Sequence, residues 1–182
     1  MEQTFRAAEG VLLVEGRVLR RVIKAHRHVK GLGLRVPHVH CYAIPRDALL
    51  RLAAPEDLDP NVRNHLTRAT DLRSVILVAR LSQAEVARLP PAEVTNRLWR
   101  AAFHARIHVE IEQRMDAGVL LEATLRERID RIGQTEFDEV REILRQDDLL
   151  LPPGGDRESY AEFVALFLEL RYFCLLYTSR CV

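Results

Sequence analysis

Residues 91–117 read PAEVTNRLWRAAFHARIHVEIEQRMDA, and this stretch decides the fold class. Four large apolar side chains in it share one face at helical spacing: Trp99, Phe103, Ile107 and Ile111. Pro91 suits the first turn of a helix, and Gly118 stands where a helix end is expected. The pattern predicts one long helix whose apolar face packs into a core.

Three further helices are expected towards the C-terminus, over residues 119–132, 135–147 and 157–173. The loops between them are short, and short loops favour antiparallel neighbours. Thr135 is the expected N-cap of the helix that it begins. Two apolar stripes on the last two helices are expected to pack against each other: Phe137, Val140, Ile143 and Leu144, and Phe163, Leu166, Phe167 and Leu170.

The N-terminal half contains two β-prone runs, at residues 39–44 and 75–79, and each is followed by a short helical segment. They predict a small element of two strands. Ser82 and Glu85 form a capping-box pattern at the start of the second short helix. Before these runs, residues 5–29 have apolar side chains at helical spacing with basic side chains between them, which predicts an amphipathic helix.

Together these elements predict a mainly α fold, a helical bundle with a small two-strand β element in the N-terminal half. The chain has 182 residues, of which 48% are apolar and 29% charged, as is typical of folded globular proteins. This length fits one domain. We therefore expect residues 1–173 to form a single, mostly helical domain or the N-terminal fragment of a longer protein.

Residues 174–182 are expected to be a non-native tail. The run CLLYTS at positions 174–179 resembles the in-frame translation of a transposon-end adapter used in sequencing libraries. On this interpretation the native protein continues beyond Phe173, and Cys41 is the one cysteine left in the native part. A single cysteine excludes an intrachain disulfide there and favours a reducing compartment.

Neither a signal peptide nor a membrane span is expected. The apolar run at residues 11–14 is stopped by Glu15, which argues against a signal peptide. The apolar stretch at 160–177 is interrupted by charged side chains: Glu162, Glu169 and Arg171. These charges are too costly at the centre of a bilayer. Arginine greatly outnumbers lysine, which is typical of a GC-rich bacterial genome, so we expect a bacterial, cytoplasmic protein.

Two histidines on the long helix, His104 and His108, are the main candidates for chemistry. They are four residues apart, so both rings project from one face of the helix, one turn apart. This spacing can chelate one metal ion. Zinc peptidases with the H-E-x-x-H pattern carry a glutamate directly after the first histidine. Here that position is Ala105, so the sequence excludes the zinc-peptidase mechanism.

A third ligand for such an ion has to come from elsewhere in the chain. His38, His40 and Cys41 are chemically suitable, and zinc or iron would be the expected ion. Glu112 is two turns from His104, about 12 Å along the axis, which is too far for one shared ion. The simpler alternative, which the sequence favours, has no cofactor and an ordinary ion pair between His108 and Glu112.

A basic strip covers residues 16–46, where no acidic residue occurs. Its candidate polyanion-binding side chains are Arg17, Arg20, Arg21, Lys24, Arg27 and Lys30. Clustered basic side chains can bind phosphates. Against nucleic acid as the partner, the strip lacks any helix-turn-helix, zinc-finger or RNA-recognition pattern.

The sequence favours a non-enzymatic helical module that acts through contacts with a protein partner or by self-association. The first alternative is a metal-dependent enzyme that uses the His-x-x-x-His face, and the second is a nucleic-acid or polyanion binder that uses the basic strip. No phosphate-binding glycine loop or nucleophile elbow is present. No resemblance to a known family is specific enough to name, so the sequence leaves open whether the protein is an enzyme.

Overall fold

The computed structural model describes residues 10–27, 40–150 and 154–174. Helices predominate in this part of the chain, and one small sheet lies in the N-terminal half. The predicted fold class, mainly α with minor β, is therefore confirmed. The chain divides into two compact units, Met1–Ala105 and Arg106–Val182, which we call the N-terminal and the C-terminal unit. The boundary falls inside one long helix.

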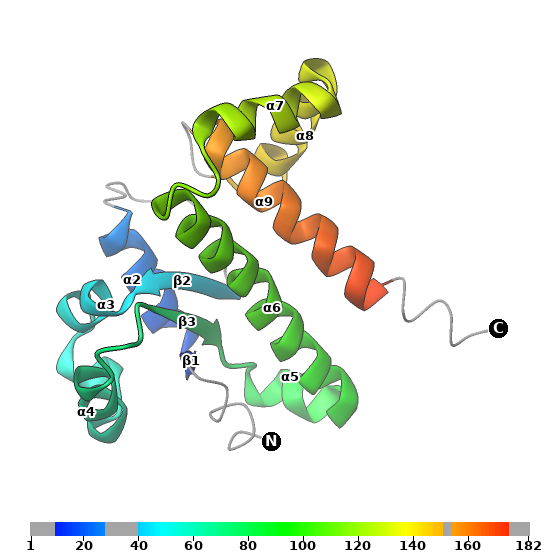
Figure 1. The fold of residues 1–182 in the computed structure, drawn as a ribbon. Helices are drawn as coiled ribbons and strands as arrows, with labels where there is room; N and C mark the ends of the chain where they lie inside the picture. The colour runs from blue at the N-terminus through cyan, green and yellow to red at the C-terminus, as the bar shows by residue number, and fades with distance from the viewer. Residues whose placement is uncertain (1–9, 28–39, 151–153, 175–182) are drawn as a thin grey trace. The chain divides into compact units, whose positions relative to one another are not determined.

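The N-terminal unit contains the sheet and the helices around it (Figure 1). Its elements are β1 (Val11–Val14), α2 (Gly16–His26), β2 (Cys41–Pro45), α3 (Arg46–Leu52), a 3-10 turn (Pro55–Asp57), α4 (Pro60–Arg68), β3 (Ser74–Ala79) and α5 (Gln83–Arg88). The central strand is β3, which pairs in parallel with β1 and antiparallel with β2. Residues 75–78 of β3 are all buried, as expected of a central strand that is covered on both faces.

The predicted helix over residues 5–29 is wrong in its N-terminal part. Residues 11–14 form β1, and α2 begins only at Gly16. The run of valine and leucine in β1 is β-prone, and pairing with β3 satisfies its backbone groups. The sheet therefore has three strands instead of the predicted two. The remaining ends of the predicted helix, residues 5–9 and 28–29, lie outside the described residues.

Helix α2 has the amphipathic character that the sequence predicts. Its buried side chains are Val18, Leu19, Val22 and Ile23. They join the core of the N-terminal unit, together with Val75 and Leu77 of β3. The exposed side of this helix carries four basic side chains, and a fifth follows the helix: Arg17, Arg20, Arg21, Lys24 and then Arg27.

Helix α5 begins with the predicted capping box. The Ser82 hydroxyl donates to Glu85 Oε2 at 2.7 Å, and the backbone N–H of Ser82 donates to the same oxygen at 2.8 Å. In return, the backbone N–H of Glu85 donates to the hydroxyl at 3.2 Å. The hydrogen bond from the Ser82 side chain, and then that from its backbone, lower the pKa of the Glu85 carboxyl.

We expect Ser82→Ala to raise the pKa of Glu85 part of the way back to its ordinary value, because the backbone donor remains. A lowered pKa in the folded protein means that the capping interaction stabilises α5 at neutral pH. That contribution is lost as the pH falls through the pKa of Glu85. An NMR titration of the Glu85 carboxyl measures the effect, and an unchanged pKa in the variant would contradict it.

All secondary-structure elements among the described residues of the C-terminal unit are helical. It receives the end of α6 (Pro91–Asp116), and continues with α7 (Glu122–Ile132), α8 (Gln134–Gln146), α9 (Asp156–Glu169) and a π-helical turn (Leu170–Cys174). When the π-helical turn is counted with α9, the bounds agree with the four predicted helices to within three residues. Gly118 follows α6 with a φ of 68°, the left-handed conformation that commonly ends a helix. In residues 10–27, 40–150 and 154–174, no helix is long and apolar enough to cross a membrane.

The apolar stripes of α8 and α9 do not bury as the sequence predicts. On α8, Phe137 and Leu144 are buried, but Ile143 is 56% exposed. Phe167 on α9 and Leu170 at the start of the following π-helical turn are exposed. The side that α9 buries consists instead of Ser159, Tyr160, Ala161, Glu162 and Ala165. The core of this unit thus joins Phe137 to Tyr160, with Leu125 and Ile129 of α7.

Helix α8 begins one residue earlier than predicted, and its N-cap is Gly133 rather than Thr135. Gly133 has a φ of 103°, a conformation that residues with a side chain rarely adopt. We expect Gly133→Ala to lower the free energy of unfolding by about 1–3 kcal/mol, because alanine is strained there. Chemical denaturation followed by circular dichroism measures this loss.

Thr135→Ala serves as the control for that experiment. If Thr135 were the cap, its removal would cost about 1 kcal/mol. The structure places it inside the helix and exposed, so the variant should unfold like the unaltered protein. If Thr135→Ala instead lowered the free energy of unfolding more than Gly133→Ala, the helix would begin where the sequence predicts.

Candidate metal centre

Helices α6 and α9 pack against each other inside the C-terminal unit. Ile111 of α6 and Ala161 of α9 belong to one buried cluster, against which Ile107 and Val164 also pack. This packing also brings together the residues that stand next to these apolar side chains on the two helices. The pair that matters is His108, next to Ile107, and Glu162, next to Ala161.

His108 and Glu162 form a close polar contact in this packed interface. His108 Nε2 lies 3.1 Å from Glu162 Oε2. The glutamate side chain is 1% exposed and the histidine side chain 21% exposed. An ionised carboxylate at such depth is costly unless a cation or several hydrogen-bond donors compensate it. The contact therefore identifies a buried place where a positive charge is stabilised.

His104 adds a second imidazole to this pair. Helix α6 is continuous through the boundary between the two units, so the helix itself holds His104 one turn before His108. His104 is only 5% exposed, which is unusual for a polar side chain. One ligand atom from each of His104, His108 and Glu162 lies within 4.8 Å of the other two.

These distances suit a metal ion with short bonds to nitrogen and oxygen. Ligand atoms about 2.0–2.2 Å from a tetrahedral zinc ion lie about 3.3 Å from one another. The distance of 3.1 Å between His108 Nε2 and Glu162 Oε2 is already close to that value. The ligand atom of His104 lies within 4.8 Å of the other two ligand atoms, so it would have to move only a little to bind the same ion. Two imidazoles and one carboxylate form a ligand set for catalytic zinc and also for non-haem iron(II).

Helical spacing in the sequence identifies the two histidines but not the carboxylate. Glu162 lies on a different helix, so no spacing rule joins it to His104 and His108. One signal was present, because Glu162 is an acidic residue inside the apolar stretch at 160–177. A buried acidic side chain in such a stretch is rare without a partner. The carboxylate expected beside His108 was that of Glu112, which the structure leaves exposed.

The other predicted ligands lie elsewhere in the chain. His40 is exposed just before β2. Cys41 is buried in β2, where its Cα pairs with that of Val78, and it forms no disulfide within the described residues. His38 lies outside those residues. The cluster of metal-ligating side chains found in the described ranges comprises His104, His108 and Glu162, and includes neither His40 nor Cys41.

Several members of the basic strip have contacts within the N-terminal unit. Arg17 lies 2.7 Å from Glu15 and Arg21 pairs with the buried Asp57. Arg27 Nε donates to the Tyr42 hydroxyl at 3.1 Å. Arg20 and Lys24 are exposed on α2, and Lys30 lies outside the described residues. Three of the arginines thus have contacts within the unit, although the pair of Arg17 with Glu15 is largely exposed and stabilises the fold little.

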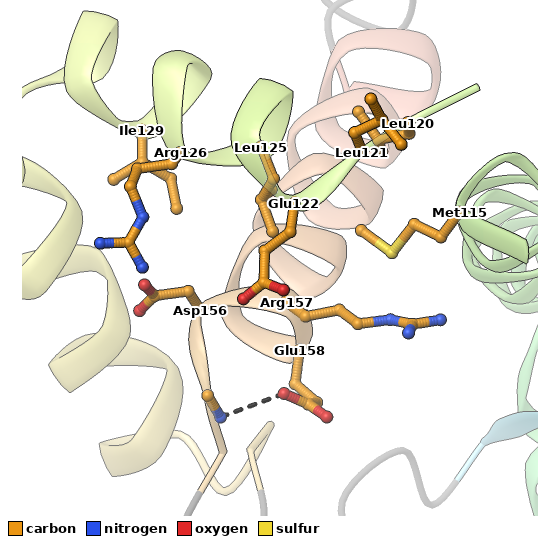
Figure 2. Close-up of a pocket in the computed structure, with 11 residues that line it drawn as sticks. Met115, Leu120, Leu121, Glu122, Leu125, Arg126, Ile129, Asp156, Arg157 and Glu158 are labelled. Carbon is orange, nitrogen blue, oxygen red and sulfur yellow. Dashed lines mark hydrogen bonds between the residues drawn. The ribbon is translucent and has the colours of Figure 1, made fainter. Parts of the chain in front are cut away.

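A cavity of about 430 Å³ opens at the start of α9 in the C-terminal unit (Figure 2). Leu125 and Ile129 of α7 line one side and Met115 of α6 another, while residues 156–158 of α9 stand at its edge. The backbone N–H of Gly155 donates to Glu158 at 3.1 Å, so this carboxylate already caps the helix. The last residue of α9 that lines the cavity is Glu158, which comes one residue before Ser159 and one turn before Glu162.

The chain matches no protein-family model, no curated protein and no solved structure.

Proposed function

We propose that the protein binds a divalent transition-metal ion, zinc or iron(II), through His104, His108 and Glu162. One observation carries the proposal: three side chains of metal-ligating type, from two helices, converge to within 4.8 Å. Neutral imidazole and carboxylate together suit both ions. In this proposal Glu162 is the third ligand, in place of His38, His40 or Cys41, which the sequence suggested.

Burial supports this proposal over a simple ion pair. A buried ion pair is weak evidence of stability, because desolvation of the two charges can exceed their attraction. A divalent cation would compensate the carboxylate of Glu162, and both imidazoles can bind such an ion as neutral ligands. Two of the three side chains are also almost completely buried, as are the ligands of a preorganised site.

The number of ligands supports an enzyme over a purely structural site. Structural zinc sites usually have four protein ligands, whereas catalytic sites have three and keep one position for water or substrate. Among the described residues, three side chains are available as ligands. We therefore propose a metal-dependent enzyme of a class other than the H-E-x-x-H peptidases, since Ala105 cannot act as a base. A reducing cytoplasm suits the buried Cys41 and an iron(II) ion.

Metal analysis of the purified protein tests the proposal. The protein is purified without a histidine tag, and zinc and iron are measured by mass spectrometry before and after dialysis against each ion. We expect close to one ion per chain, and none in the double variant His104→Ala and His108→Ala. The matched control, His40→Ala with Cys41→Ser, should retain the ion.

Two results would contradict the proposal. One is an unaltered protein that takes up neither zinc nor iron at micromolar concentrations. The other is a stoichiometric ion that the control variant loses and the double histidine variant keeps. The second result would show that His40 or Cys41, near β2, binds the ion.

A protein-contact module is the second candidate function, and exposed apolar side chains favour it. Phe167 of α9 and Leu170 of the π-helical turn that follows it are three residues apart, and both are more than half exposed. Exposed apolar side chains that lie together commonly mark protein contacts. Sedimentation velocity of a metal-free sample tests this candidate: self-association that Phe167→Asp and Leu170→Asp abolish would support it, and a monomer at all concentrations would oppose self-association.

A further inference from the structure

Ser159 is a polar side chain that the helical packing buries completely. Its exposed fraction is 0%, and its hydroxyl makes no hydrogen bond with any described residue. A buried hydroxyl without a partner loses the hydrogen bonds that it makes to water in the unfolded chain. Native proteins keep few such groups, and a bound water molecule or ion is a common reason for those that remain.

The position of Ser159 relative to the proposed metal ligands is fixed by helix geometry. Ser159 precedes Glu162 by three residues on α9, and both belong to the side that this helix buries. Side chains three residues apart lie on one side of a helix, with their Cβ atoms about 5–6 Å apart. Ser159 is thus the next buried polar group along α9 from the carboxylate.

Two groups at this spacing on one helix can be bridged through one metal-bound water molecule. A water oxygen lies about 2.1 Å from a zinc ion, by analogy with other oxygen ligands, and a hydrogen bond between oxygens is about 2.8 Å long. Together they join the ion to a hydroxyl about 5 Å away. A serine hydroxyl can accept a hydrogen bond from water or donate one to a hydroxide ion.

We infer that Ser159 positions a water molecule that completes the coordination of the ion bound by His104, His108 and Glu162. The inference rests on the proposed metal site and specifies what fills its open position. Ser159 acts through the water and is a positioning residue, while the three ligands hold the ion. The expected ligand class of the open position is water, hydroxide or a small anion that displaces them.

Two effects of opposite direction are expected from Ser159→Ala. In the metal-free protein the variant should melt at a higher temperature, because it removes a buried hydroxyl that has no partner. In the metal-loaded protein its affinity for the ion should fall about 10-fold, as is typical when a hydrogen bond around the ligands is lost. A purely structural serine would change both properties in the same direction.

Cobalt(II) in place of zinc provides a direct readout of the bound water. Its visible absorption changes when the coordinated water loses a proton, so a pH titration gives a midpoint. The Ser159 hydroxyl donates to the hydroxide form and stabilises it, so Ser159→Ala should raise the midpoint by about one pH unit. Ser159→Thr keeps a hydroxyl and should restore the midpoint, and the control Ser82→Ala should leave it unchanged.

The outcomes separate this inference from the proposed function. A protein that binds neither cobalt nor zinc overturns both. A Ser159→Ala variant that binds cobalt with unchanged affinity and an unchanged midpoint leaves the metal site intact and overturns the role of Ser159. A lower melting temperature of the metal-free variant also overturns it, because the hydroxyl would then have a partner in the protein.

Discussion

Glu162→Gln is expected to lower the affinity of the protein for zinc by at least about 100-fold. Loss of a hydrogen bond around metal ligands typically costs 10–100-fold, and loss of a ligand should cost no less. Glutamine preserves the size of the side chain, so the contact of α9 with α6 can remain. It removes the negative charge that the ion requires. Competition with a chromophoric chelator measures the affinity.

Glu112→Gln is the matched control for this change. Glu112 lies on the same helix as the two histidines and one turn after His108, but it is exposed. The control should bind zinc like the unaltered protein. If instead Glu112→Gln weakened binding and Glu162→Gln did not, the carboxylate would be the one that helical spacing suggests, and the packing of α9 would have no part in the site.

Phe137→Ala is expected to lower the free energy of unfolding by about 3–5 kcal/mol. Phe137 is 0% exposed and lies at the centre of the cluster with Leu125, Ile129 and Tyr160. Loss of a large buried ring removes its transfer free energy and leaves a cavity, and such changes typically cost this amount. Tyr160 lies beside Ser159 on α9, so the same core also supports the helix that carries Glu162.

Urea denaturation followed by circular dichroism measures the effect of Phe137→Ala. The samples contain a chelator, because a bound ion would raise the apparent stability of the folded state. Ile143→Ala on the same helix is the control, and its exposed side chain should contribute less than about 0.5 kcal/mol. Equal losses in the two variants would show that α8 does not bury the face that carries Phe137.

The helices after residue 90 could be predicted because their signals are local. Pro91 stands at the start of the long α6 and Gly118 after its end, although Trp99, on the face predicted to pack into a core, is 43% exposed. Gly118 and Gly133 also mark the ends of their helices in the structure. Such signals depend on neighbours in the chain, and for that reason the predicted bounds agree closely with the observed ones.

The errors arise where tertiary packing decides. The valines of β1 continue the spacing of α2 by chance, and only pairing with β3 makes this segment a strand. On α9 the large apolar side chains suggested a buried stripe, yet the helix buries small and polar side chains and exposes Phe167. Small residues such as Ala161 and Ala165 leave room for a neighbouring helix, which a search for large apolar residues overlooks.

The candidate site shows the same division between local and tertiary information. His104 and His108 could be identified because helical spacing alone places their rings together. Their third partner could not, because Glu162 reaches them only through the packing of α9 against α6. For this reason the sequence favoured a non-enzymatic helical module, and the metal site that we propose depends on this packing.

The most direct test of this metal site is a crystal structure of the protein grown with zinc, with diffraction recorded on both sides of the zinc absorption edge. We predict one anomalous peak, about 2.0–2.2 Å from a nitrogen of His104, a nitrogen of His108 and an oxygen of Glu162. A map with no peak there, and with His108 bonded directly to Glu162 at high zinc concentration, would contradict the account.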